Sequence, residues 1–243
     1  GYGAHCGSAV DAVSVQLSAF PLLDSLVVQD GTWRSALCDD LTCCPEQGRP
    51  LDEVVDPLTA ALIAAGSAPY RSREDLVAAF GPSALDQQQH EQRAAALAKV
   101  RPDRPVDLLP AVLQVLLAAV APSWEDVAIV CAGLRDVRVR DAVLRHLHES
   151  PQSRWAVRAA LLTLLSKVPA DAYPAVACVL AGCAWLDGNG AVARIAIDRC
   201  READPGYSLA RLLDRALQYG IPPTVWADSL AAVSIDDCLS GAA

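Results

Sequence analysis

Hydrophobic positions recur with helical spacing from Val54 to the end of the chain. The clearest predicted helix covers residues 207–219. Its apolar positions follow the i, i+3, i+4, i+7, i+8 pattern of one helical face: Leu209, Leu212, Leu213, Ala216 and Leu217. Its other side is polar: Arg211, Asp214, Arg215 and Gln218. This pattern predicts an amphipathic helix whose apolar face packs on the preceding helix, around Ile197.

The first 50 residues show a different, mixed pattern. Two short runs, residues 26–28 and 32–37, flank the pair Asp30 and Gly31. Asp-Gly between such runs is the strongest short-range signal of a β-hairpin. Because an isolated hairpin is marginally stable in water, we expect it to belong to a larger sheet.

Local polar signals predict further helix boundaries. Three Ser-x-x-Asp sequences are typical of a capped helix start, with these first residues: Ser8, Ser72 and Ser123. Prolines punctuate the second half of the chain, as expected for successive helices with short connections. In the segment 136–148, Asp136 stands four residues before Arg140, and Asp141 four before Arg145. This spacing predicts surface ion pairs on a solvated helix face.

Residues 174–207 resemble one tetratricopeptide unit of about 34 residues. The positions that match its pattern of small residues, bulky residue, turn glycine and closing proline are Leu180, Ala181, Gly188, Ala193, Ile197, Cys200 and Pro205. An ordinary helical hairpin whose glycine turn mimics the repeat is the alternative. Earlier segments do not hold the period, so no repeat array is predicted.

These patterns predict a mainly α fold in two parts. Residues 51–243 form a helical, partly tetratricopeptide-like domain with a repeat-like helix pair at 174–207. Residues 1–50 form a small α/β remnant with one β-hairpin and a cysteine-containing loop. Because the chain contains no methionine, even at position 1, we expect this remnant to be the exposed end of a longer protein.

Composition narrows the range of partners. Of the 243 residues, 53% are hydrophobic and 20% charged, which is typical of a folded globular chain. The formal net charge of −9 disfavours binding to nucleic acid or to anionic membrane surfaces. The longest apolar run, residues 174–186, is shorter than the roughly 18 to 20 residues that a bilayer requires. We therefore expect neither a nucleic-acid nor a membrane partner.

The cysteines indicate a reducing compartment. Nine cysteines are too sparse and irregular for a secreted disulfide scaffold, and an odd number leaves one unpaired. We therefore expect a cytoplasmic protein with reduced thiols. Four cysteines lie in apolar helical stretches, where the side chain acts as a small hydrophobe of the core: Cys131, Cys178, Cys183 and Cys200.

The loop that leaves the hairpin carries the most distinctive chemistry. Cys38, Cys43 and Cys44 occur within residues 37–50, and His5 completes a candidate set of metal ligands if the first helix folds back. Zinc prefers four thiolate or imidazole ligands in a tetrahedron. The Cys-x4-Cys-Cys spacing differs from a Cys-x2-Cys knuckle, however, and adjacent cysteines fit a tetrahedron poorly. Three interpretations follow: a metal site, a redox or nucleophilic thiol, and a structural loop with packed thiols, which we favour.

No other motif indicates a cofactor or a reaction. The sequence contains no nucleophile elbow, P-loop or H-E-x-x-H motif. The glycines of residues 1–8 miss the G-x-G-x-x-G phase by one position. The sequence therefore nominates no catalytic residue and no cofactor, and leaves open whether the protein is an enzyme.

Four ordered blocks of the chain resemble a bacterial family known as domain of unknown function 4192. The blocks are residues 33–50, which contain Cys38, Cys43, Cys44, Pro45, Gly48 and Pro50, then residues 72–76, residues 184–190, and residues 204–210 running on to Pro222 and Pro223. The chain departs from the family pattern at Leu41, where the family often has proline, and at Pro45-Glu46-Gln47-Gly48, where the family usually has two prolines followed by Glu-Gly. The resemblance implies a fold, a further N-terminal α/β portion and a bacterial cytoplasmic setting, and it supplies no activity.

Two functions remain as hypotheses. The first is a non-enzymatic helical interaction module whose stacked helices present a concave surface to a protein partner. The second is a metal- or small-molecule-binding protein, enzymatic or not, that uses the loop around Cys38, Cys43 and Cys44. The sequence does not give the oligomeric state.

Overall fold

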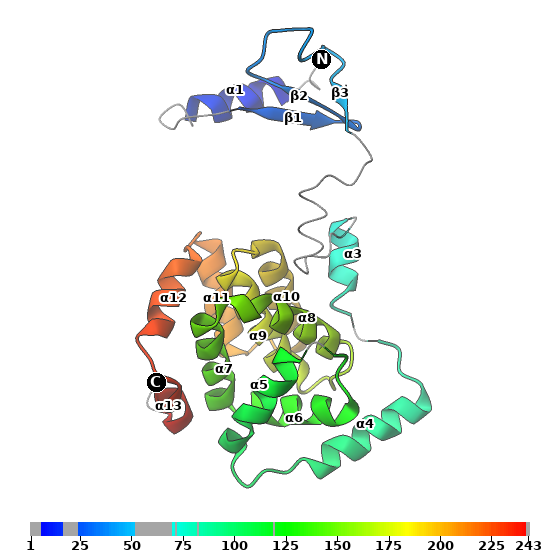
Figure 1. The fold of residues 1–243 in the computed structure, drawn as a ribbon, viewed down its shortest axis with the longest axis vertical. Helices are drawn as coiled ribbons and strands as arrows, with labels where there is room; N and C mark the ends of the chain where they lie inside the picture. Colours follow the sequence, from blue (N-terminus) through cyan, green and yellow to red (C-terminus); the bar gives the residue numbers. More distant parts are fainter. Residues whose placement is uncertain are drawn as a thin grey trace. The chain divides into compact units, whose positions relative to one another are not determined.

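The computed structural model describes residues 6–16, 24–51, 70, 72–81, 83–118 and 120–241. The chain divides into two compact units, Gly1–Ala61 and Leu62–Ala243. Figure 1 labels the elements of both units. The boundary that the sequence placed at residue 50 stays a prediction, because residues 52–69 lie outside the described part.

The N-terminal unit contains one helix and a three-stranded antiparallel sheet. The elements are α1 (Cys6–Gln16), β1 (Leu26–Gln29), β2 (Thr32–Ser35) and β3 (Arg49–Pro50), and the strand order is β1-β2-β3. The predicted hairpin is confirmed: Gln29 pairs with Thr32 across a turn in which Asp30 and Gly31 have φ of 49° and 74°. Positive φ at both positions is what a type I′ turn requires. Ser8 lies inside α1, which already includes Cys6, so that predicted helix start was wrong.

The helical unit confirms the mainly α prediction. Its α-helices are α3 (Arg73–Ala78), α4 (Gln87–Lys99), α5 (Leu109–Leu117), α6 (Trp124–Leu134), α7 (Val137–Glu149), α8 (Arg154–Leu165), α9 (Tyr173–Leu186), α10 (Gly190–Ala203), α11 (Ser208–Gln218), α12 (Pro223–Ala231) and α13 (Ile235–Ser240). Ser72 caps α3, and Ser123 forms a complete capping box with Asp126 at the start of α6, as predicted. Among the described residues, no helix is both long and apolar enough to cross a membrane.

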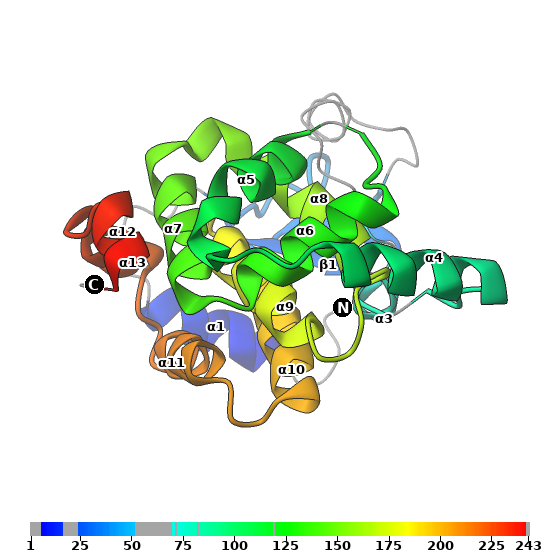
Figure 2. The same cartoon turned by 90° about the horizontal axis from the view of Figure 1, so that it is seen from below.

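Helix α9 is the centre of the core. Every residue from Pro174 to Trp185 is buried, because this helix is apolar on all sides and is covered by its neighbours. Figure 2 shows α9 surrounded by α6, α7, α8 and α10, all of which it contacts. The predicted core thiols are confirmed, and their positions include Cys178 and Cys183 in α9 itself.

Helices α9 and α10 form the hairpin that the sequence placed at residues 174–207. Gly188 adopts a φ of +72° in the connection, and the side chain of Asn189 caps α10 by accepting a hydrogen bond from the N–H of Val192 at 3.1 Å. A left-handed conformation at this position favours glycine. The assignment of this pair to the tetratricopeptide type stays a prediction.

Helix α11 packs against α10, but its two faces differ from the predicted ones. Leu213 is buried, whereas Leu212 is 62% exposed. Asp214, which the pattern placed on the polar side, is buried and forms ion pairs with Arg194 at 2.6 Å and with Arg201. The helical period identified the position of α11 correctly, and the local contacts decided which residues were covered.

The predicted ion pairs of α7 were also wrong. Asp136 caps the helix and pairs with Arg138. Arg140 is buried, where its guanidinium donates to Asp141 at 2.8 Å and to the Tyr207 hydroxyl at 3.2 Å. This arginine therefore ties α7 to the start of α11 and does not belong to a solvated face.

Candidate metal centre

Strand pairing closes the loop that carries the candidate ligands. β2 and β3 pair through Thr32 with Pro50 and Trp33 with Arg49, so the two ends of the loop lie side by side. Gly48, just before β3, has a φ of +77°, and a Cβ atom there would lie 2.8 Å from the Thr32 hydroxyl oxygen. Only glycine fits both the conformation and the space.

Asp40 organises the turn that precedes the adjacent cysteines. Its Oδ1 accepts a hydrogen bond from the N–H of Thr42 at 2.8 Å, and its carbonyl oxygen accepts from the N–H groups of Cys43 and Cys44 at 3.0 and 2.7 Å. The backbone hydrogen bonds from Thr42 and Cys43 lower the pKa of the Asp40 carboxyl group. The carboxylate and the backbone carbonyl of Asp40 thus together hold the backbone of residues 42–44 in a tight turn.

Arg49 connects this turn to the sheet. Its Nε donates to the carbonyl oxygen of Cys43 at 2.5 Å, and its Nη2 donates to that of Thr42 at 3.3 Å. A guanidinium group with several fixed donors is suited to such a bridge. The contact also places a positive charge beside Cys44, where it favours the thiolate.

The three loop cysteines converge on one point. The Sγ atoms of Cys38, Cys43 and Cys44 all lie within 4.8 Å of one another. Cys44 is buried, Cys38 is half-buried and Cys43 is exposed. In a tetrahedral zinc site, Zn–S bonds of about 2.3 Å put the sulfur atoms about 3.8 Å apart. A small contraction of the loop would therefore bring all three sulfur atoms to bonding distance of a single ion.

The surroundings of the cluster shift the pKa values of the Cys44 and Cys43 thiols in opposite directions. A hydrogen bond from the backbone of Ser35 lowers the pKa of the Cys44 thiol, and Cys38, Cys43 and Arg49 lower it further. The hydrogen bond with Cys44, followed by the negative charges of Cys44 and Cys38, raises the pKa of Cys43. Cys44 is thus the first of the two to ionise, and Cys43 ionises more easily once a cation offsets this repulsion.

The structure brings together three of the four sequence-nominated ligands. His5 lies outside the described residues, so its position relative to the cluster is not defined. Sequence reasoning missed the supporting roles of Asp40 and Arg49. Asp40 had a detectable signal, since an Asp two residues before a Thr is typical of a side-chain-capped turn. Arg49 had none, because its role depends on the pairing of β3.

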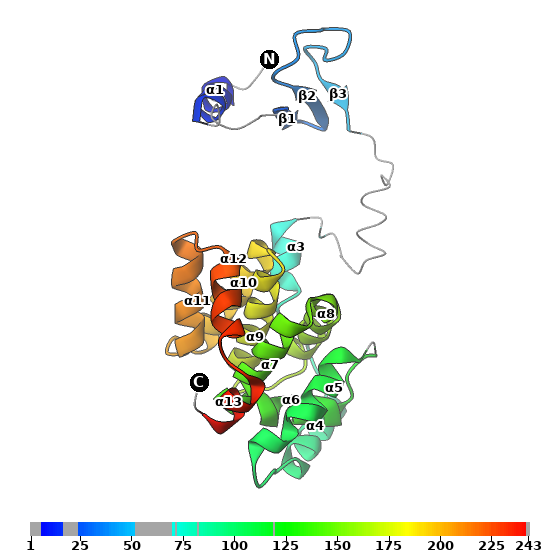
Figure 3. The same cartoon turned by 60° about the vertical axis from the view of Figure 1, so that its left-hand side comes forward.

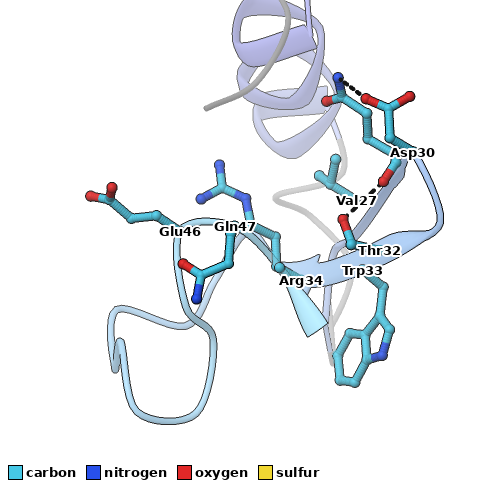
Figure 4. A pocket seen from close by; sticks show the side chains of 9 residues that line it. Val27, Asp30, Thr32, Trp33, Arg34, Glu46 and Gln47 are labelled. Atoms are coloured by element: carbon cyan, nitrogen blue, oxygen red, sulfur yellow. Dashed lines mark hydrogen bonds between the residues drawn. The ribbon is translucent and has the colours of Figure 1, made fainter. Parts of the chain in front are cut away.

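A polar hollow of 220 Å³ lies on the same hairpin. Figure 4 shows the side chains of Arg34, from β2, and of Glu46 and Gln47, from the loop, on the same side of the strands, whereas Trp33 extends to the other side. Asp30 also lines the hollow. Because the lining carries both signs of charge, it indicates no single ligand chemistry.

The described cysteines of the helical unit are of a different kind. They are buried in the helical unit: Cys131, Cys178, Cys183, Cys200 and Cys238. Burial raises the pKa of Cys131 and of Cys183 to about 12. The thiols of Cys131 and Cys183 are therefore neutral at physiological pH and are poor ligands and nucleophiles.

Comparison with known proteins places the chain in a family. The model of the family described as Domain of unknown function (DUF4192) matches residues 4–224. This range contains the cysteine loop, the hairpin and most of the helical unit. No curated protein and no solved structure matches the chain. The chain therefore belongs to the DUF4192 family, as the sequence block around the adjacent residues Cys43 and Cys44 had indicated.

Proposed function

We propose that the N-terminal unit binds one zinc ion through the thiolates of Cys38, Cys43 and Cys44. The observation that supports this proposal is the convergence of three Sγ atoms within 4.8 Å of one another. A structural loop needs no such convergence, because packed thiols are stabilised equally well by contact with any apolar neighbour.

The chemistry of the ligands favours a soft or borderline metal. Thiolate ligands select zinc, copper(I) and iron–sulfur clusters, whereas magnesium and calcium require oxygen ligands. The lowered pKa of Cys44 supplies a thiolate at low cost, and the bound cation would stabilise the thiolate of Cys43. Zinc is the simplest choice, since four thiolate and imidazole ligands form its usual structural sites, and three such ligands leave one position open.

The fourth ligand decides what the site does. In this proposal His5 supplies a ring nitrogen and closes a structural Cys3His site, which would join the start of the chain to the cysteine loop. A site without His5 would keep a water molecule in the fourth position, as catalytic zinc sites do. Replacement of His5 by alanine distinguishes the two, because only the closed site loses affinity for zinc.

The experiment that tests the proposal is metal analysis of the purified chain after reconstitution with zinc and removal of excess ion. We expect one zinc per chain, a loss of at least half of it in Cys44→Ser, and full retention in Cys238→Ser, which alters a thiol of the helical unit. Equal zinc contents in the two variants would contradict the proposal. A zinc-free chain whose Cys44 reacts rapidly with peroxide would favour a redox thiol instead.

An interaction with a protein partner is the second candidate, and a separate surface supports it. Val120 is 73% exposed and Trp155, in α8, is 49% exposed, and both line a shallow hollow of 410 Å³. An exposed apolar patch of this kind is typical of a docking surface. In this proposal the protein is cytoplasmic, and it binds neither nucleic acid nor membranes.

Crosslinking in the native host tests this second candidate. We expect a photoreactive residue at position 155 to form one stoichiometric crosslinked complex that Val120→Glu abolishes. The matched control is Val137→Glu, at a position on α7 that is 57% exposed and does not line this hollow. Loss of the complex in both variants, or in neither, would count against this surface.

A further inference from the structure

A second, apolar hollow lies in the helical unit where α7, α11, α12 and α13 meet. Figure 3 shows α11, α12 and α13 following one another along one side of this unit. The hollow has a volume of 280 Å³. Its walls are mostly large apolar side chains, among them Leu144, Leu209, Leu212, Trp226, Leu230 and Val233. Ligand sites are typically hollows of this composition that also hold a few polar groups.

Trp226 forms a fixed wall of the hollow. Its ring stacks on that of Trp185 in α9, with centroids 5.2 Å apart and planes 17° apart. Gly182 permits this position, because a Cβ atom there would lie 2.6 Å from the Trp226 ring. A neighbouring hollow of 220 Å³ shares Trp226, Leu209 and Leu212, so the apolar surface continues past the ring.

Leu212 is an exposed residue at the edge of both hollows. It is 62% exposed although it lies on the apolar face that the helical period predicts for α11. The core does not cover this face completely. The uncovered part of α11 is the part that borders the hollows, which is the arrangement expected if a ligand completes the packing.

Arg145 supplies the polar group of the hollow. Its Nε donates to the carbonyl oxygen of Val233, and its Nη2 pairs with Glu149 at 3.0 Å. Its Nη1 is buried and has no hydrogen-bond partner among the described residues. A buried N–H without a partner is unfavourable, so this donor gains a hydrogen bond when the guanidinium group of Arg145, whose side chain lines the hollow, turns toward an acceptor bound there. Arg140, which also lines the hollow, already donates to Asp141 and Tyr207.

We propose that this hollow binds a small amphipathic monocarboxylate. The carboxylate accepts a hydrogen bond from Nη1 of Arg145, and the alkyl or aryl part lies against Leu144, Trp226 and Leu230. The charges of Arg140 and Arg145 offset those of Asp141 and Glu149, so the one unmet donor suits a single negative charge, whereas a phosphate dianion would be repelled more strongly by these carboxylates. On the scale of about 30 Å³ for one water molecule in the liquid, the hollow holds about nine non-hydrogen atoms.

Octanoate is a probe of the required size and charge. We expect it to bind the full chain saturably at one site per chain and to change tryptophan fluorescence, because Trp226 lines the hollow. The neutral analogue 1-octanol should bind at least about tenfold more weakly, the ratio expected for the loss of one charge-assisted hydrogen bond. Equal affinities for octanoate and octanol, no saturable binding, or tighter binding of octylamine would each overturn the proposal.

Three variants locate the site. Arg145→Met should weaken octanoate binding at least about tenfold and leave octanol binding unchanged. Arg138→Met is the matched control in the same helix, because Arg138 pairs with Asp136 and does not line the hollow. Leu212→Glu, at an exposed position where folding tolerates the change, should abolish octanoate binding. Unchanged octanoate binding in Leu212→Glu would place the ligand elsewhere and overturn the assignment, whatever happens to the fold of the Arg145 variant.

Discussion

At the scale of single residues, Asp214 shows what permits a charge inside the helical unit. Its side chain is 8% exposed, and it accepts hydrogen bonds from Arg194, Arg201 and Gln218. A buried carboxylate without such partners would be strongly unfavourable. The three donors come from two helices, so this one residue links α10 to α11.

Removal of Asp214 should therefore destabilise the fold. We expect Asp214→Ala to lower the free energy of unfolding by about 1 to 3 kcal/mol, because the hydrogen bonds are lost while the arginines stay partly solvated. Asp198→Ala is the matched control: Asp198 also pairs with Arg194 but is 41% exposed, so its loss should cost less than about 1 kcal/mol. Urea denaturation measures both, and equal costs would contradict this role of Asp214.

The buried thiols predict how stability depends on pH. The pKa of Cys183 rises from 9.0 to about 12 on folding. A raised folded-state pKa contributes stability that is complete below pH 9 and is lost as the pH rises toward 12. Above pH 9, the free energy of unfolding should fall by about 1.4 kcal/mol per pH unit for this thiol. Cys183→Ala should remove that part of the slope between pH 9 and 10.5, and an unchanged slope would refute the assignment.

At this scale, the sequence predicted only in part which charged and apolar residues are buried. The period of α11 indicated a buried Leu213, which is confirmed. It gave no sign that Asp214 is buried, because its arginine partners stand 20 and 13 residues earlier in the chain. Similarly, the sequence assigned Arg140 to a solvated pair, whereas Tyr207, 67 residues away, accepts its hydrogen bond. Partners that meet only after folding leave no local pattern.

At the scale of elements, short-range sequence signals correctly predicted a turn and a helix start that depend on local backbone geometry. The Asp30-Gly31 turn and the capping box of Ser123 both depend on residues within a few positions, and both are present. β3 was missed, because it consists of Arg49 and Pro50 and exists only through its pairing with β2. That missed strand is the one that positions the loop of the candidate metal centre.

The two leucines at the middle of α11 test the packing of this helix. Leu213 is buried and Leu212 is exposed, although both belong to the predicted apolar face. Leu213→Ala should cost about 2 to 5 kcal/mol, since it leaves a cavity in the core. Leu212→Ala should cost less than about 0.5 kcal/mol, because its side chain is mostly in water. Similar costs in the two variants would show that the face of α11 has been assigned wrongly.

At the scale of the whole molecule, the thiols divide between the two units. The N-terminal unit holds the convergent cluster of Cys38, Cys43 and Cys44, and the helical unit holds only buried thiols in its described part. The sequence predicted the mainly α architecture and the core thiols from composition and period. It could not predict the convergence of the cluster, since that follows from the turn at Asp40 and the closure of the loop by β3.

Thiol labelling under non-reducing conditions tests this division. In the native, metal-free chain, we expect the exposed Cys43 to react quickly with an alkylating reagent and the thiols of the helical core to react only on unfolding. After denaturation all nine thiols should react, because the described cysteines are free and the compartment is expected to be reducing. Two or more protected pairs in protein kept reduced would contradict the absence of structural disulfides.

The most direct test of the metal centre is the X-ray absorption spectrum of the zinc-loaded chain at the zinc edge. Our account predicts three sulfur neighbours at about 2.3 Å and one nitrogen or oxygen neighbour at about 2.0 Å. In the His5→Ala variant the sulfur shell should persist. A spectrum with only oxygen and nitrogen neighbours, or with a single sulfur, would show that Cys38, Cys43 and Cys44 do not bind the ion together.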